Sequence, residues 1–260
     1  MSSFAHHRRH PAAALVVLLF GLLTTGMLYT AFDSGAANAA VASETQIEEG
    51  KLLFAEGCAT CHGMNGAGGT DGPNIQNAGA AGAHFQIMTG RMPMATIAQM
   101  SRRGTPQFTE EQAQAISAYV ATLGTGPAIP TAEEYAWENA DLAKGGEIFR
   151  TNCAQCHSFT GMGGALTWGK AAPNLMQATP QQIFEAMISG PNNMPSFSNE
   201  TLPIADKQAV IKYIENLKTP NNPGGLDLGR TGPVTEGLFL WIFGMGALIL
   251  VSVWIGVKAK

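Results

Sequence analysis

The chain of 260 residues has few charges, few cysteines and no pattern typical of a β-strand. Only 13% of its residues are charged, and 15 basic against 19 acidic side chains give a net charge of −4. This balance argues against a nucleic acid as partner. The apolar fraction of 45% argues against disorder. Apolar surface must therefore be hidden in lipid or around a cofactor, and the sequence predicts an all-α fold.

An uncharged run, residues 11–32, follows Arg8 and Arg9. At about 1.5 Å per residue it is long enough to cross a bilayer core of about 30 Å. Ala37-Asn38-Ala39 offers a small-x-small cleavage site, so a cleaved signal peptide is the alternative. We predict that residues 1–33 form a cytoplasmic N-terminus and a transmembrane anchor.

A second uncharged run predicts a C-terminal transmembrane helix over residues 237–257. Trp241 and Trp254 lie near its ends, as interfacial aromatics do, and Lys258 and Lys260 favour a cytoplasmic C-terminus. The sequence therefore predicts a multi-pass protein of the cell membrane, with the intervening residues on the extracytoplasmic side.

The residues between the two runs contain an internal repeat. A shift of 95 residues superimposes Cys58-x-x-Cys61-His62 on Cys153-x-x-Cys156-His157, and with some drift Met92-Pro93 matches Met194-Pro195. Two copies of one module are therefore expected, at residues 44–123 and 141–218. Residues 124–140 form the linker between them, and residues 219–236 form a tether to the membrane helix.

Apolar periodicity and helix-capping residues predict the helices of each module. In the first module we expect a helix over residues 44–56 and another that begins at Thr109. In the second we expect helices over residues 142–151 and 206–218, and one that Thr179 caps and that runs from Pro180 to Ser189.

The Cys-x-x-Cys-His segments carry the chemistry. This pattern is the attachment signature of c-type haem, in which two thiols bind the porphyrin edge and the following histidine binds the iron. It occurs twice and uses every cysteine, so Cys58, Cys61, Cys153 and Cys156 are predicted to attach two haem c groups, with His62 and His157 as axial ligands. Two disulfides or a zinc site are the alternatives, but neither requires a histidine after both pairs.

A haem that transfers electrons has six iron ligands, so a sixth ligand is expected in each module. A methionine thioether suits this role, because it favours ferrous iron and raises the potential. Met92 and Met194 are equivalent across the repeat and both precede a proline. Met94 lies two residues from Met92, so it stays open as an alternative ligand in the first module. His84 is the remaining histidine between the two runs, and we expect it on the surface.

Pro73-Asn74 and Pro173-Asn174 occupy matching positions in loops, where backbone groups can reach the iron-binding histidines. The glycine-rich stretches 66–69 and 161–164 lack the strand, lysine and hydroxyl residue of a phosphate loop. We predict that these stretches are turns that wrap the haem.

Each module resembles a class I cytochrome c domain in its haem motif, its Met-Pro turn and its flanking helices. The whole arrangement, including Gly229-Arg230-Thr231-Gly232-Pro233 before the last helix, resembles the dihaem cytochrome c subunit of actinobacterial cytochrome bc1 complexes. The resemblance implies cytochrome b and Rieske subunits and cytochrome aa3 oxidase as partners. The chain would carry electrons from the Rieske protein to that oxidase as the electron-transfer subunit of a quinol–cytochrome c reductase.

The residues alone indicate a membrane-tethered dihaem electron carrier. One alternative is the cytochrome subunit of a membrane-bound dehydrogenase. The other is a dihaem peroxidase, which would need an open iron site with an acid–base residue beside it, and His84 is the spare histidine for that role.

Overall fold

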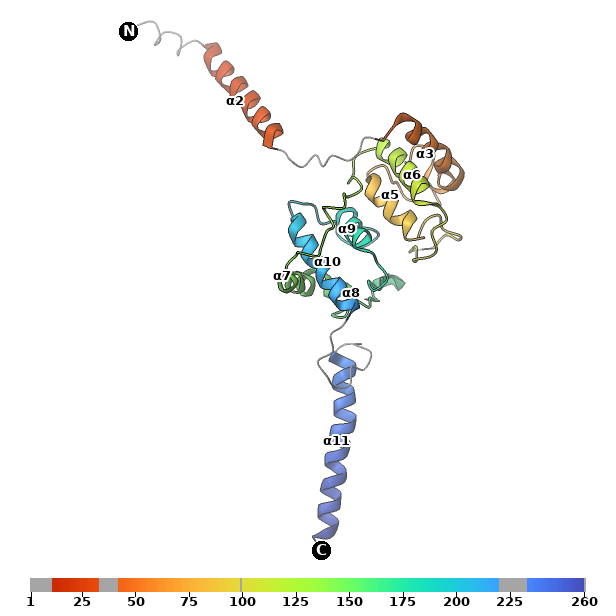
Figure 1. Ribbon diagram of the computed structural model, residues 1–260, viewed down its shortest axis with the longest axis vertical. Coiled ribbons are helices and arrows are strands. Elements are labelled where there is room, and N and C mark those ends of the chain that lie inside the picture. The colour runs from red at the N-terminus through yellow and green to blue at the C-terminus, as the bar shows by residue number, and fades with distance from the viewer. Residues whose placement is uncertain (1–10, 33–41, 99, 220–232, 260) are drawn as a thin grey trace, which may run out of the picture. The chain divides into compact units, whose positions relative to one another are not determined.

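The computed structural model describes residues 11–32, 42–98, 100–219 and 233–259 (Figure 1). The chain divides into two units, residues 1–41 and 42–260, and both modules lie in the second. The expected cleavage site at Ala37-Asn38-Ala39, Arg8 and Arg9, and the tether residues 220–232 lie outside the described part.

The modules are mostly helical, as predicted, and they repeat one order of helices. The first contains α3 (Glu44–Gly57), α4 (Ala59–His62), α5 (Gly79–Met88) and α6 (Glu110–Thr122), and the second contains α7 (Leu142–Ile148), α8 (Ala154–His157), α9 (Pro180–Ser189) and α10 (Ile204–Lys218). Thr109 and Thr179 cap α6 and α9 through capping boxes, which confirms where these helices begin. Helix α7 is shorter than expected, because the chain continues as a π-helical turn, Phe149–Cys153.

The first and last helices of each module cross at a glycine. A Cβ atom on Gly50 of α3 would lie 1.9 Å from the Ala115 carbonyl oxygen of α6, and one on Gly145 of α7 would lie 1.9 Å from that of Ala209 in α10. No side chain fits at either crossing, so the backbones touch directly. The repeat of Gly50 and Gly145 in the sequence is thus a packing requirement.

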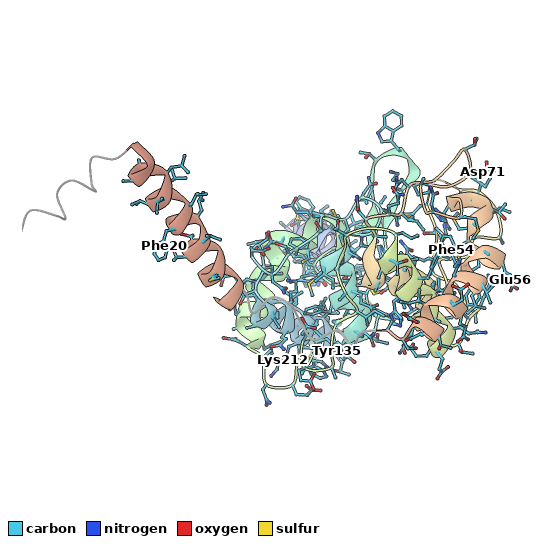
Figure 2. The ribbon with its side chains drawn as sticks, turned by 90° about the horizontal axis from the view of Figure 1, so that it is seen from above. Phe20, Phe54, Glu56, Asp71, Tyr135 and Lys212 are labelled. Atoms are coloured by element: carbon cyan, nitrogen blue, oxygen red, sulfur yellow. The ribbon has the colours of Figure 1, made fainter. Side chains whose placement is uncertain are left out.

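An aromatic pair lies beside each crossing. The ring centroids of Phe54 and Tyr119 are 5.2 Å apart, and those of Phe149 and Tyr213 are also 5.2 Å apart. Phe54 is 1% exposed and points into the first module, whereas Asp71 lies at its surface (Figure 2). Each module therefore has its own hydrophobic core under the crossing helices.

A two-stranded hairpin is the feature that the sequence did not predict. Strand β1 (Gly164–Ala165) pairs antiparallel with β2 (Ala171–Ala172). The offset between equivalent residues rises here from 95, between Gly68 and Gly163, to 100, between Pro73 and Pro173. The second module thus has five extra residues in the segment that contains this hairpin. Trp168, in the same segment, is 86% exposed.

One described helix is long and apolar enough to cross a membrane. It is α11 (Pro233–Lys258), in which the apolar stretch runs from Val234 to Lys258. Helix α2 (Pro11–Phe32) contains a shorter apolar stretch, Ala13–Met27, and exposed apolar residues such as Phe20 (Figure 2).

The helix crossings can be tested by adding one methyl group. We expect Gly50→Ala and Gly145→Ala each to lower the free energy of unfolding by about 3 kcal/mol, because the new Cβ must push two backbones apart. Thermal unfolding of the purified chain measures the effect.

Gly82→Ala in α5 is the matched control. Its Cβ would meet Ser189 Cβ at 3.6 Å, an ordinary contact, so this change should be neutral or stabilise the chain by up to about 1 kcal/mol. Equal losses in all three variants would contradict the proposed role of the crossings.

Candidate functional site

The Cys-x-x-Cys-His segment of each module forms a single helical turn, α4 or α8. In α4 the His62 amide donates to the Cys58 carbonyl at 3.0 Å. All four cysteines are free thiols. Burial, and then the adjacent thiol, raises the pKa of Cys58 and Cys153 to about 11. These two thiols are protonated at neutral pH, unlike the low-pKa thiol of a redox-active pair.

Among the described residues the structure has neither a disulfide between these cysteines nor a zinc-type cluster. No disulfide joins the four cysteines, all of which the structure describes. Within the described ranges, no group of three or more His, Cys, Asp or Glu side chains could hold a metal ion, as a zinc site would require.

Both iron-binding candidates are oriented by a proline carbonyl. His62 Nδ1 donates to the Pro73 oxygen at 2.8 Å, and His157 Nδ1 donates to the Pro173 oxygen at 3.0 Å. Because a carbonyl can only accept, Nδ1 carries the proton and Nε2 keeps its lone pair for a metal. Burial lowers the pKa of His157, which further favours the neutral ring. In both modules the backbone of the Pro-Asn loop thus contacts the histidine, as expected.

The glycine-rich turns close over these histidines in the same way twice. The Gly68 amide donates to the His62 carbonyl at 2.8 Å, and the Gly163 amide donates to the His157 carbonyl at 2.9 Å. Gly68 and Gly163 have φ values of 82° and 85°, in the left-handed region where glycine is favoured. The expected turns therefore hold both proline loops against the Cys-x-x-Cys-His segments.

The second module encloses a cavity of about 430 Å³. Cys153, Cys156, His157 and Met194 all line it, together with apolar side chains. The structure thus brings together every residue that the sequence assigned to this site. Part of the wall comes from the first module, through Phe85, Met100 and three arginines, Arg91, Arg102 and Arg103.

A buried lysine anchors the loop that follows Met194. The Lys207 ammonium is 0% exposed and donates to the Ser198 carbonyl at 3.2 Å, Asn199 Oδ1 at 2.9 Å and the Leu202 carbonyl at 2.5 Å. Burial lowers its pKa to about 8, although nearby carboxylates oppose this shift. Lys207 lies on α10, so the loop that carries Met194 is attached to the core of the module.

In the first module the structure does not separate the two methionine candidates. The Met92 amide donates to the Gln86 carbonyl at 3.0 Å, and the side chains of Met92 and Met94 are both partly buried. The assignment of Met92 therefore still depends on its equivalence to Met194 in the repeat.

His84 corrects the expectation of a surface residue, since it is only 3% exposed. It lies on α5, which packs against α9 of the second module (Figure 1). His84 Nδ1 donates to Glu185 Oε1 at 2.7 Å, and Nε2 donates to Glu110 Oε1 at 2.9 Å. Both ring nitrogens are engaged, so His84 is not available as the acid–base residue of a peroxidase.

The His84 cluster binds protons more tightly than the same groups would in water. Burial alone lowers the pKa of His84, but its hydrogen bonds to Glu185 and Glu110 and their charges outweigh burial and raise it. Burial also raises the pKa of Glu185, which is 0% exposed. The sequence pattern did not predict the pair of His84 and Glu185, because the two residues are 101 positions apart in the chain.

The comparison with known proteins identifies the family. The cytochrome bc1 complex cytochrome c subunit of Corynebacterium efficiens is 42% identical over 268 aligned positions, covering 96% of this chain and 90% of that protein. The chain belongs to this actinobacterial family of cytochrome c subunits. A member from Mycobacterium tuberculosis is 42% identical over 253 positions, covering 94% of this chain and 90% of that protein.

Family models also match each module of this cytochrome c subunit. The model "Cytochrome c" matches residues 47–124, and the model "Cytochrome C oxidase, cbb3-type, subunit III" matches residues 140–214. The chain therefore contains two cytochrome c domains, each with its own Cys-x-x-Cys-His segment.

The residues of the second domain fit a haem c group. The cavity offers two free thiols at the required spacing, an imidazole with an available Nε2, a thioether and apolar walls. It also holds a buried polar atom without a hydrogen-bond partner among the described residues, Arg91 Nη1, which suits a ligand that carries carboxylates.

The His84 cluster predicts that stability falls as pH rises. A group whose pKa is raised by folding stabilises the protein below its unfolded pKa, about 6.5 for histidine, and this contribution disappears as pH rises through the folded pKa. We expect His84→Gln to cost about 3 kcal/mol near pH 6, because it leaves the buried Glu185 without its cation, and to cost less near pH 9.

Thermal unfolding of the wild-type chain and of the His84→Gln variant, each near pH 6 and near pH 9, measures this difference. Glu110→Gln is the control. The Glu110 side chain is 45% exposed, so its loss should cost no more than about 1 kcal/mol. A cost of His84→Gln that is the same at both pH values would contradict the proposed titration.

Proposed function

We propose that each module binds one haem c through its two thiols, with its histidine and one methionine as axial ligands of the iron. These residues are Cys58, Cys61, His62 and Met92 in module 44–123, and Cys153, Cys156, His157 and Met194 in module 141–218. The shared cavity of the second set and the matching histidine orientation in both sets support the proposal.

The protein groups around each site set its electronic properties. A bound haem supplies a one-electron couple of its iron. The Pro73 and Pro173 carbonyls hold the imidazoles in one tautomer and increase their basicity. With haem bound, the thioether of Met194 would favour the reduced metal, and apolar side chains such as Ile183 and Val210 would keep water away from it.

We infer that the chain transfers electrons from the Rieske iron–sulfur protein to the copper centre of cytochrome aa3 oxidase, within an assembly that includes cytochrome b. The observation that carries this inference is the direct contact between the modules, where His84 binds Glu185 and Arg103 Nη2 donates to Gln182 Oε1 at 2.7 Å. Two cofactor sites in one folded unit suit a fixed relay. The low charge of the chain does not suit a steered, diffusing carrier.

We further propose that the chain crosses the cell membrane twice, through α2 and α11. Both termini would lie in the cytoplasm and both modules outside it. The length and apolar composition of α11 support the second crossing, and the uncharged sequence of α2 after Arg8 and Arg9 supports the first.

The axial ligands are tested by exchanging methionine for histidine. Met92→His and Met194→His should each lower the potential of one haem, because a nitrogen donor favours ferric iron more than a thioether does. Potentiometric titration of the purified chain measures both potentials, and a haem stain of a denaturing gel checks that covalent attachment is retained. Met94→His is the matched control. If it lowered a potential and Met92→His did not, Met94 would be the ligand.

The first membrane crossing predicts that the mature protein keeps its N-terminal segment. N-terminal sequencing of the protein from its native membrane should find a start before residue 11. A start at Ala40, directly after the Ala37-Asn38-Ala39 site, would show a cleaved signal peptide and leave α11 as the anchor.

The relay predicts that quinol-driven oxygen consumption by the purified assembly needs no added soluble cytochrome c. The rate should also fall little as ionic strength rises, because no electrostatically steered encounter limits it. Oxygen uptake measured with and without soluble cytochrome c, over a series of salt concentrations, tests this. A strict requirement for the soluble protein, with activity lost at high salt, would show a docking site for a mobile carrier.

A further inference from the structure

The cavity of the second module is lined by cations without anions. Its wall contains four basic side chains, Arg91, Arg102, Arg103 and Lys170, and no Asp or Glu. These are four of only 15 basic residues in a chain whose net charge is −4. Like charges gathered on an apolar cavity favour an anionic occupant.

Arg91 is the basic side chain of this wall that has a buried nitrogen without a hydrogen-bond partner among the described residues. It is 7% exposed, its guanidinium lies 5.0 Å from the centroid of the Phe85 ring, and its Nη1 has no hydrogen-bond partner among the described residues. A buried charge without a partner is strongly destabilising. An anion in the cavity would supply the missing partner.

Arg103 reaches the same cavity through the contact between the modules. Its Nη2 donates to Gln182 Oε1 of α9 at 2.7 Å, and Gln182 Nε2 donates back to the Met88 carbonyl of α5 at 3.4 Å. These bonds hold a segment of the first module against the second at the edge of the cavity.

We propose that Arg91 and Arg103 of the first module bind the propionate carboxylates of the haem that the second module holds. The inference rests on the proposed attachment of that haem to Cys153 and Cys156. Haem carries two propionates, and arginine binds carboxylates in a two-pronged geometry. The second haem site is then complete only when the two modules are docked.

The position of Arg91 in the sequence suggests a different partner, because it precedes Met92, the proposed ligand of the first haem. The residues that line the cavity bear on whether Arg91 faces the first haem or the second. None of Cys58, Cys61, His62 and Met92 lines it, whereas Cys153, Cys156, His157 and Met194 all do. Arg91 thus shares a cavity with the proposed haem ligands of the second module, which supports its assignment to that haem.

The test measures the potentials of both haems in the full-length chain, by potentiometric titration in detergent. The second haem is the component that is missing from a Cys153→Ala, Cys156→Ala variant. Arg91→Gln and Arg103→Gln remove one cation each, and Arg91→Lys keeps the charge. Arg150→Gln is the matched control, since Arg150 is exposed and close to Cys153 but does not line the cavity.

Loss of a cation beside the propionates should favour ferric iron in the second haem. We expect each glutamine variant to shift its ferric-to-ferrous ratio about fivefold, or about 40 mV to lower potential at 59 mV per tenfold. Arg91→Lys should shift it less, and Arg150→Gln should not shift it. An unchanged second potential, or a shift of the first potential alone, would overturn the inference. A wild-type chain without haem on Cys153 and Cys156 would overturn the proposed function, and the inference with it.

Discussion

Helix α5 of the first module packs against helix α9 of the second, and His84 lies between two carboxylates at this contact. Glu185 is fully buried there, so its charge is tolerated only while a cation stays beside it. Beside this contact, Arg103 donates a hydrogen bond to Gln182. Arg91 lines the cavity of the second module. This contact is accompanied by first-module residues, among them Phe85 and Arg91, that form part of the wall of the second module's cavity.

The two modules share a framework but differ in what surrounds their sites. Gly50 and Gly145 let the first and last helices touch in the same way, and Pro73 and Pro173 orient the histidines alike. The second module adds the β1–β2 hairpin and takes part of its cavity wall from the first. Different surroundings for two similar sites are a physical route to two different potentials.

Local patterns predicted the parts of the structure that depend on local forces. Thr109 and Thr179 begin helices because their side chains cap them, and the Cys-x-x-Cys-His segments form turns within one short stretch of chain. Patterns failed where partners come from distant parts of the chain. His84 pairs with Glu185, and Arg91 lines a cavity that is formed mostly by the other module, so neither environment leaves a periodic trace in its own segment. The extra hairpin was visible as a change of repeat offset, but its strands are too short to show alternation.

We expect the contact between α5 and α9 to hold the two modules, and with them the two proposed haems, in one fixed arrangement. Pulsed electron paramagnetic resonance on the oxidised, purified chain can measure the distance between the two ferric irons. We expect one narrow distance distribution in the wild type and a broader one in the His84→Gln variant. A broad distribution in the wild type, unchanged by the substitution, would contradict it.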